Sequence, residues 1–358
     1  MHSKGARLDG RQYEAIRPKG LFPRAASLLR CKAYELNRRR RGMSGYSSTV
    51  RPYTLARALL ALNTSGQIVY TGEFGAEVTT FIPFVMWLKR EGLLAGRRVI
   101  TYRGMRPYYY FLDDVDYAEK EAKRRWLPVE ERAWPSASTY TALRCPWHVY
   151  PDYRTHYRLR GETFARPTLF IQNKFSVEWK KGPLNFITLD VLERIFSELG
   201  ARFDIIYSRP RELENTPGFV GDRTEICSYP DLDLARRFAN VLVLEDYCAA
   251  TGTPYNQTKL EILAKTHIFI AVQGGGAHLL ACFGNSVLLL LHREGEEYPH
   301  AYERGPYKYL ADPAPALLLA RTHKRMLKGV GLLEQIDMTE GSPRLPRDLL
   351  SAFSSLRV

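Results

Sequence analysis

Short runs of β-branched and apolar residues alternate along most of the chain with longer segments whose apolar positions recur at helical spacing. In the first half, this pattern predicts a strand over 67–71, a helix over 78–90 and a second strand over 98–102. Glycines at Gly72 and Gly75 separate the first strand from the helix. A strand, a glycine turn, a helix and a strand in this order predict a parallel βαβ unit.

The second half repeats this alternation over a longer distance. The pattern predicts five further strands, over 169–172, 203–207, 241–245, 267–272 and 287–291. It also predicts three helices, over 188–199, 256–265 and 277–283. Such alternation is typical of a parallel sheet with helices on both faces. The sequence therefore predicts the α/β class, with two Rossmann-like domains joined near residue 160.

Three segments depart from this pattern. The stretch 108–167 is rich in Tyr, Trp and Pro, and because it is long for a structureless loop, we expect short helices and a binding role there. The start of the chain has little apolar periodicity, and the chain becomes polar beyond Thr322. We expect four parts: a basic N-terminal arm over 1–60, Rossmann-like domains over 61–165 and 166–325, and a C-terminal extension over 326–358.

The composition excludes disorder and a membrane span. Hydrophobic residues make up 45% of the 358 residues, which is enough for a full core. No apolar run approaches the roughly 18 residues of a membrane helix, and the first ten residues lack the apolar block of a signal peptide. We therefore expect a cytoplasmic protein.

Cysteine usage favours a reducing compartment. The five cysteines are widely spaced and include no CxxC pair: Cys31, Cys145, Cys227, Cys248 and Cys282. An odd number without such spacing argues against a disulfide framework and against a zinc ribbon. Each cysteine is better interpreted as a small core residue than as a nucleophile.

The chain is strongly basic, with 52 Lys and Arg against 38 Asp and Glu and a net charge of +14. Much of this charge lies in the N-terminal arm, which includes the run Arg38–Arg41. Two interpretations stay open: a solvated arm, or an electrostatic contact with anionic lipid or nucleic acid that would make the protein peripheral to a membrane. Nucleic acid is the weaker partner, because no helix-turn-helix, zinc-finger or RNP pattern is present.

The most informative stretch runs from His267 to Leu291 and contains three consecutive glycines, Gly274 to Gly276, between a strand and a helix. Glycines let an anion approach the backbone, and the start of a helix offers free N–H groups. The turn also falls at the carboxyl end of a strand, where open α/β sheets bind ligands. We interpret it as a diphosphate site. It is neither a GxGxxG dinucleotide fingerprint nor a GxxxxGK[ST] P-loop.

With this domain pattern, the chain resembles GT-B-fold glycosyltransferases, which bind a nucleotide-sugar in the C-terminal of two Rossmann-like domains. The segment Gln273–Phe283, with the letters QGGGAHLLACF, is similar to the HGAGL turn of an inverting family. That family includes plant xylosyltransferases and animal O-linked N-acetylglucosaminyltransferases, and similar turns occur in bacterial proteins with a VQGG motif. The resemblance covers about residues 65–320, and the turn is its specific part.

The resemblance implies a donor site at the strand ends of the C-terminal domain. In such enzymes, a polar or basic residue after the first strand of that domain reaches the donor phosphates, and Asn173 and Lys174 occupy this place. The loop after the strand at 287–291 would contact phosphate, ribose or sugar. The expected donor-binding residues are Asn173, Lys174, Gln273, Gly274, Gly275, Gly276, His278, Arg293 and Glu297.

The N-terminal domain would then bind the acceptor through the glycine turn at Gly72 and Gly75. An inverting transferase needs a base for the attacking hydroxyl, and Glu73 and Glu77 flank this turn. His278 is a rival base whose place favours phosphate binding. Two arginines that follow the strand over 98–102, Arg103 and Arg106, could hold an anionic acceptor.

These observations predict a glycosyltransferase that moves a sugar from a nucleotide-diphosphate sugar to a glycan or lipid-linked glycan. Because no Asp-x-Asp motif lies at a strand end, we expect metal-independent, inverting chemistry without a cofactor, in which the nucleotide-sugar is a co-substrate. One alternative keeps the fold but transfers another group, as in polysaccharide pyruvyl transferases. A second alternative is a basic nucleic-acid-binding protein.

Overall fold

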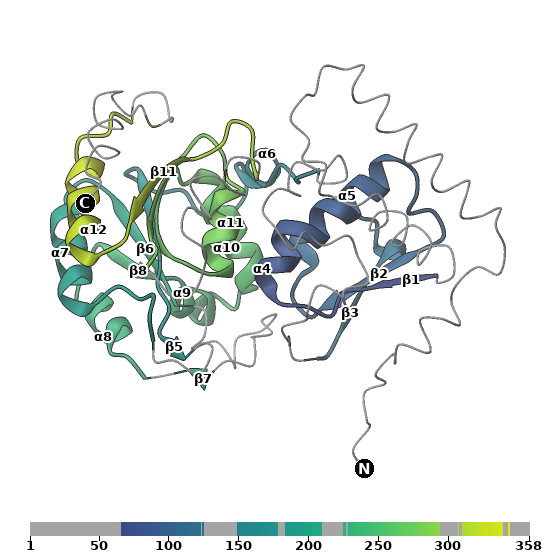
Figure 1. The fold of residues 1–358 in the computed structure, drawn as a ribbon, viewed down its shortest axis with the longest axis horizontal. Helices are drawn as coiled ribbons and strands as arrows, with labels where there is room; N and C mark the ends of the chain where they lie inside the picture. Colours follow the sequence, from purple (N-terminus) through teal and green to yellow (C-terminus); the bar gives the residue numbers. More distant parts are fainter. Residues whose placement is uncertain are drawn as a thin grey trace, which may run out of the picture.

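The computed structural model describes residues 66–122, 124, 149–177, 183–209, 225–226, 228–293, 307, 310–338 and 343. This part of the chain is an α/β structure with two parallel sheets (Figure 1). The predicted basic arm over 1–60 lies outside the described residues. Among the helices that are described, none has the length and apolar character that crossing a membrane would require.

The first sheet belongs to what we call the N-terminal unit, the described residues between 66 and 165. Its order is β1-β2-β3, with all strands parallel: β1 (Gln67–Val69), β2 (Arg98–Tyr102) and β3 (Tyr117–Lys120). A continuous helical segment joins β1 to β2, formed by α4 (Phe74–Ala76), the π-helical turn η1 (Glu77–Phe81) and α5 (Ile82–Arg90). The predicted βαβ unit is thus confirmed.

The Tyr- and Trp-rich stretch adds one strand that the sequence pattern did not predict, β3. Around it lie three short helical turns, as expected for a long segment of this composition: η2 (Arg106–Tyr109), η3 (Asp114–Asp116) and α6 (Tyr153–Tyr157). Much of this stretch, including the residues around Trp126 and Trp134, lies outside the described residues.

The second sheet forms the C-terminal unit, the described residues from 166 onward. Its six strands are all parallel: β4 (Thr168–Gln172), β6 (Asp204–Ser208), β8 (Val241–Val243), β9 (Ile268–Val272), β10 (Val287–Leu291) and β11 (Ala316–Ala320). They lie in the order β11-β10-β9-β4-β6-β8. Numbered in chain order, this is 6-5-4-1-2-3, the strand order of a Rossmann fold.

Helices cover both faces of this sheet. They are α7 (Leu189–Leu199), α8 (Asp231–Ala235), α9 (Leu244–Thr251), α10 (Tyr255–Lys265), α11 (Gly275–Ala281) and α12 (His323–Leu333). Two short segments, β5 (Ser176–Val177) and β7 (Glu225–Ile226), pair antiparallel beside the sheet. The central strands β4, β9 and β10 are buried along their whole length, which is why they are continuous apolar runs without alternation.

Local sequence accounts for α7 in particular. Apolar residues at helical spacing, among them Val191, Ile195 and Phe196, are buried against the sheet. The helix begins after Thr188 and ends at Gly200, where any larger side chain would collide with Asn240. The predicted helix over 188–199 is confirmed to within one residue.

One hydrophobic core connects the two units. The side chains on one face of the C-terminal sheet, with α9, α10 and α11, pack in the same cluster as the core of the N-terminal unit. In Figure 1, α10 and α11 lie between the large sheet and α4. Polar contacts cross the same boundary, since Asn256 Nδ2 donates to Gly104 O at 2.7 Å. The predicted boundary at 165/166 falls between α6 and β4, and a shared core spans it.

Arg154 of α6 makes several polar contacts across this boundary. Its guanidinium donates to Ala264 O and Thr266 O, both at 2.8 Å, and to Gly284 O at 3.1 Å. Ala264 lies in the last turn of α10, Thr266 directly follows that helix, and Gly284 follows α11. Arg154 therefore connects α6 by hydrogen bonds to the C-terminal ends of α10 and α11.

Two sequence predictions need correction. The C-terminal extension was expected to begin at 326, but α12 spans this position and packs on β10 and β11, so the sheet's helical layer continues to Leu333. The strand expected over 241–245 ends at Val243, because Leu244 and Glu245 already form the first turn of α9.

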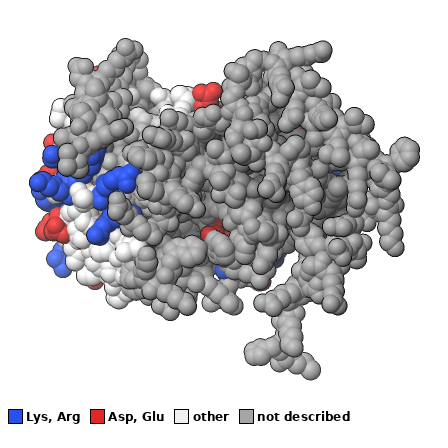
Figure 2. Space-filling model, in the orientation of Figure 1, with Lys and Arg blue, Asp and Glu red and all other residues white. Residues whose placement is uncertain are grey.

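Part of the positive charge of the described residues lies far from the N-terminal unit. In the view of Figure 2, Lys and Arg side chains gather at the outer end of the C-terminal unit, where Figure 1 shows α7 and α12. Residues 61–358 nevertheless carry 38 Lys and Arg against 35 Asp and Glu, so most of the net charge of +14 belongs to the predicted arm over 1–60.

Replacing Arg154 tests how strongly α6 is fastened. We expect Arg154→Leu to lower the free energy of unfolding by about 2 kcal/mol or more, because hydrogen bonds from a charged donor are lost and buried carbonyls lose their partners. Arg158→Leu, at an exposed position on the next turn, should change it by less than about 0.5 kcal/mol. Urea unfolding of the two variants measures both values, and equal effects would contradict this role.

Candidate functional site

The strand order fixes where a ligand is expected on the C-terminal sheet. From β4, the first strand of the sheet in chain order, the next two strands are added on one side. The fourth strand, β9, is added on the other side, so the order of the strands reverses between β4 and β9. In open α/β sheets, ligands bind at the carboxyl ends of the strands on either side of such a switch point. Here those ends carry Asn173 and Lys174 after β4, and Gln273 and Gly274 after β9.

Each of the three glycines has its own structural reason. Gly274 has φ +141° and ψ −175°, a backbone conformation that side chains with a Cβ rarely adopt. A Cβ on Gly275 would lie 3.0 Å from Gly75 N and 3.1 Å from Phe74 Cδ1 of α4. A Cβ on Gly276 would run into the side chain of Gln172.

This finding changes the interpretation of the glycine run. From the sequence, all three glycines are expected to leave space for an anion. Instead, the space beside Gly275 is filled by the N-terminal unit, and the space beside Gly276 is filled by the Gln172 side chain of β4. Gly274 alone of the three combines a glycine-requiring conformation with a cation beside it, since Lys174 Nζ would lie 3.6 Å from its Cβ position.

Lys174 and His278 form the polar surroundings of Gly274. Burial, with the nearby Lys174 ammonium, lowers the pKa of His278 to about 4, so the imidazole is neutral near pH 7. The rings of His278 and Tyr307 are nearly perpendicular, with centroids 5.7 Å apart. The His278 Cδ2 atom would lie 3.1 Å from a Cβ on Gly75. His278 therefore belongs to the contact between the units as well as to the glycine turn.

Asn173 does not have the role that the resemblance implies. It is fully buried, and its amide nitrogen donates to Ile187 O, Tyr207 Oη and Asp231 Oδ2 at 3.1–3.3 Å. Its Oδ1 atom accepts from the Ile187 N–H at 2.9 Å. With every polar atom engaged inside the protein, Asn173 anchors the loop over 183–188 and is not available to a donor phosphate.

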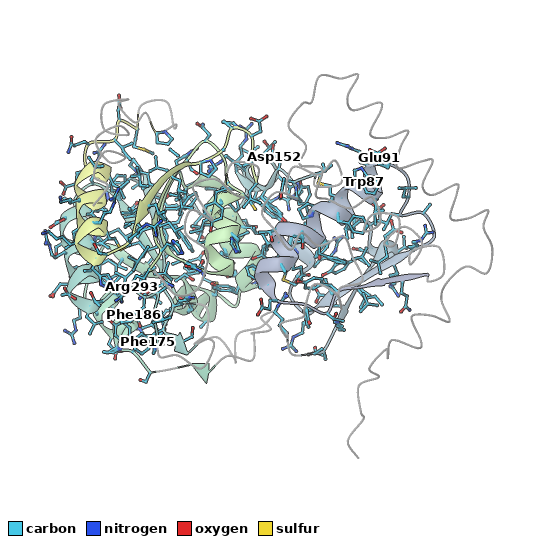
Figure 3. All side chains as sticks on the ribbon, in the orientation of Figure 1. Trp87, Glu91, Asp152, Phe175, Phe186 and Arg293 are labelled. Carbon is cyan, nitrogen blue, oxygen red and sulfur yellow. The ribbon has the colours of Figure 1, made fainter. Side chains whose placement is uncertain are left out.

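This anchored loop contributes residues that the sequence pattern does not indicate. Asn185 Oδ1 accepts from the Arg293 N–H at 2.6 Å, and Arg293 Nη1 donates to Leu184 O at 3.3 Å. Figure 3 shows Arg293, Phe186 and Phe175 in the same part of the C-terminal unit. The rings of Phe175 and Phe186 pack edge to face, with centroids 4.8 Å apart. The loop thus links the end of β4 to the end of β10.

Two buried amide atoms at this edge have no hydrogen-bond partner among the described residues, Asn185 Nδ2 and Gln273 Oε1. Their side chains are 1% and 3% exposed. Buried polar atoms are rarely left unpaired, so each such atom calls for an explanation. One is a donor and the other an acceptor, which suits a polar, uncharged group of a ligand.

On the N-terminal side, Gly75 lies directly against Gly275. Gly72, which is buried, and Glu73, which is half-buried, immediately precede α4. Glu77 is a different case. Its side chain is fully buried, one carboxylate oxygen accepts from the hydroxyls of Thr101 and Tyr109, and the other pairs with Arg124 at 2.5 Å. Such a carboxylate holds the N-terminal unit together, and its internal contacts argue against the predicted role as a base.

The two arginines expected to bind the acceptor are also used within their own unit. Arg106 donates to Tyr109 O, Leu112 O and Asp114 Oδ1 at 2.7–2.9 Å. Arg103 pairs with Glu121 at 3.1 Å on the surface. Neither contact brings a guanidinium to the glycine turn. Glu297, the remaining predicted residue, lies outside the described residues.

A buried charged network beneath the switch point was not predicted. Lys259 of α10 is 2% exposed, and its ammonium donates to Gln172 Oε1 at 2.8 Å. Glu245 of α9 is 6% exposed and accepts from Ser208 Oγ and the Arg209 N–H. Helical spacing offers a signal for it, because Tyr255, Lys259 and Leu263 follow one another at intervals of four on the buried face of α10.

The charges of this network are shifted strongly by their surroundings. Burial raises the pKa of Glu245 to about 7, despite hydrogen bonds that favour its charged form. Burial lowers the pKa of Lys259 to about 7, against the attraction of Glu245. Both groups therefore change protonation close to neutral pH.

Groups that could hold a metal ion, with three or more His, Cys, Asp or Glu side chains, are not found among the described residues. The Asp231-Leu-Asp233 sequence lies in α8, where Asp231 is buried and paired with Arg209. The absence of a metal from the chemistry stays a prediction.

No family model matches this chain, and comparisons with curated proteins and with solved structures find no match either. The geometry of the site therefore carries the functional argument.

Replacing a glycine by alanine shows whether the missing side chain is needed for packing. Gly276→Ala should lower the free energy of unfolding by about 1–3 kcal/mol, because its Cβ collides with Gln172. Gly331→Ala in α12, where nothing lies within 4 Å of the added Cβ, should raise it by about 0.5–1 kcal/mol through helix propensity. Chemical denaturation of both variants tests this, and a stabilising Gly276→Ala would refute the packing role.

The buried carboxyl group predicts a pH dependence of stability. Because folded Glu245 keeps its proton to higher pH than the unfolded chain does, its contribution is fully present below pH 4.5 and is lost as the pH rises to about 7. We expect Glu245→Gln to remove this decline.

The measurement is the free energy of unfolding in urea at several pH values across that window. Glu193→Gln, at an exposed position on α7, is the matched control and should keep the slope of the wild type. If Glu245→Gln shows the wild-type slope as well, the carboxyl group is not buried in the way described.

Proposed function

We propose that the chain is a glycosyltransferase that moves a sugar from a nucleotide-diphosphate sugar to a glycan or glycoconjugate acceptor. The observation that carries this proposal is the arrangement at the switch point. A Rossmann strand order directs a ligand to the ends of β4 and β9, and there the ammonium of Lys174 lies beside the backbone of Gly274. An ammonium group next to the backbone of a glycine suits a diphosphate.

The neighbouring unpaired amides support a nucleotide-sugar over a bare diphosphate. Asn185 Nδ2 and Gln273 Oε1 offer one donor and one acceptor without partners inside the described protein. A nucleobase edge or a pair of sugar hydroxyls carries the complementary acceptor and donor. In this proposal the two amides bind the uncharged part of the donor, and Arg293, held by the same loop, faces its phosphates.

The chemistry follows from the charges at the site. Cleavage of the sugar–phosphate bond leaves negative charge on the diphosphate, and Lys174 stabilises that charge where it develops. The attacking hydroxyl needs a base. Of the two predicted carboxylates, Glu73 is the candidate that remains, because it precedes α4 at the contact with α11. This account assigns no step to a metal ion, and it corresponds to an inverting transfer.

The contact between Gly75 and Gly275 also constrains how the acceptor enters. The backbones already touch there, so no substrate fits between these two residues. We place the acceptor beside this contact, toward Glu73 and Lys174.

Binding of nucleotides tests the proposal most simply. We expect UDP or GDP to bind the wild type, and Lys174→Gln to weaken binding by about 10- to 100-fold, the range for losing a hydrogen bond to a charged group. Lys328→Gln, at an exposed position on α12, removes the same charge far from the switch point and should bind like the wild type. Isothermal titration with UDP, GDP and CMP, followed by release of diphosphate from the matching nucleotide-sugars, measures this.

Two results would overturn the proposal. In one, none of the nucleotides binds the wild type, and salt-sensitive binding of DNA or RNA would then favour a nucleic-acid-binding protein. In the other, a nucleotide binds but Lys174→Gln and Lys328→Gln weaken it equally, so that the effect reflects only net charge.

A further inference from the structure

The buried pair of Lys259 and Glu245 has no place in the proposed chemistry, yet it lies directly beneath the switch point. The Lys259 ammonium has a single hydrogen-bond acceptor among the described residues, Gln172 Oε1 at 2.8 Å. Two aromatic rings, those of Tyr255 and Phe170, lie 5.6 and 5.7 Å from Nζ. The ammonium is thus held by a neutral amide and two ring faces.

Glu245 interacts with Lys259 through its charge, and no direct ion pair joins these two described residues. Its Oε1 atom accepts from Ser208 Oγ at 3.0 Å and from the Arg209 N–H at 2.9 Å, both at the end of β6. Its Oε2 atom is buried and has no hydrogen-bond partner among the described residues. The carboxylate therefore acts on Lys259 through its charge, while its hydrogen bonds bind it to the sheet.

Gln172 connects this network to the glycine turn. It is the last residue of β4, and its side chain fills the space that a Cβ on Gly276 would need. Gly276 lies in the first turn of α11, two residues after Gly274. Lys259, Gln172 and the start of α11 thus form one continuous line of contacts.

We propose that Lys259 is a positioning residue: by holding Gln172 against Gly276, it fixes the first turn of α11 beside Lys174 and Gly274. The part of this proposal that concerns a ligand rests on the proposed function, because it takes the glycine turn as the nucleotide site. The part that concerns α11 does not.

Physical chemistry separates this role from a purely structural one. A buried ammonium pays a large cost in lost hydration, and an apolar side chain of similar length in its place is often neutral or stabilising. If Lys259 only filled space, Lys259→Met would leave α11 and any ligand unaffected. If Lys259 positions Gln172, the same substitution leaves the fold intact but loosens the start of α11.

The first experiment is amide hydrogen exchange of the full-length protein, followed by mass spectrometry of peptides covering α11 and α12. The His278 N–H donates to Gly274 O, so the amides from 278 onward report on the first turn. In Lys259→Met we expect these amides to exchange about tenfold faster, as for the loss of one hydrogen bond. Exchange in α12 should not change.

The matched control is Lys265→Met, the same substitution at a surface lysine in the last turn of α10. Its α11 amides should exchange at the wild-type rate. If α11 exchange is the same in Lys259→Met, Lys265→Met and the wild type, the positioning role is refuted. If α12 and the rest of the chain accelerate equally with α11, Lys259 supports the whole fold and the proposal is likewise wrong.

The second experiment is a double-mutant cycle on nucleotide binding, with UDP and GDP as probes. Lys259→Met and Gln172→Met should each weaken binding by about tenfold, and the double variant should be no weaker than either, because both substitutions break the same line of contacts. Additive effects would contradict the coupling. Unchanged affinity despite a loosened α11 would refute the role in ligand binding.

The two experiments also keep this inference apart from the proposed function. If no nucleotide binds the wild type, the proposed function fails. The exchange of α11 in Lys259→Met still decides whether Lys259 positions the helix.

Discussion

The backbones of α4 and α11 meet at Gly75 and Gly275, where a Cβ on either residue would come within about 3 Å of the other unit. This close approach determines how the N-terminal unit sits on the C-terminal sheet. It places α10 and α11 in a core shared by both units, and it brings the turn after β1 to the turn after β9. Glycine is needed on both sides, because two backbones can approach this closely only where side chains are absent. Arg154 and Asn256 then strengthen the same boundary with hydrogen bonds.

Residues near this contact have different structural roles. Gly275 and Gly276 serve packing, whereas Gly274, with φ +141°, presents its backbone beside Lys174. Asn173 is committed to the loop over 183–188, and that loop carries Asn185 to the end of β10. Beneath them, Gln172 at the end of β4 contacts Lys259 of α10 and the start of α11. Polar groups at the switch point are thus of two kinds, those that hold the framework and those with capacity left for a ligand.

Local patterns predicted the framework well. The buried strands are continuous apolar runs, and α7 follows from its spacing and from Gly200. Contacts between distant segments account for what was missed. Glu77 looks like a carboxylate at the start of a helix, but Thr101, Tyr109 and Arg124 surround it only in the folded chain. The glycine run suggested an anion site, although Gly75 and Gln172 explain two of its members. The strands β3 and β11 were not predicted. The sequence of β3 includes Glu119 and Lys120, and its place follows from its pairing with β2, whereas β11 is an apolar run that the sequence pattern could have indicated.

The central claim is that the ends of β4 and β9 bind the diphosphate of a nucleotide. A crystal structure of the full-length protein soaked with UDP or GDP tests it most directly. The account predicts that the diphosphate lies between Lys174 Nζ and the backbone at Gly274, with the nucleoside or sugar side toward Asn185 and Gln273. Density for the nucleotide at the N-terminal sheet, or at another edge of the C-terminal unit with Lys174 unengaged, would contradict it.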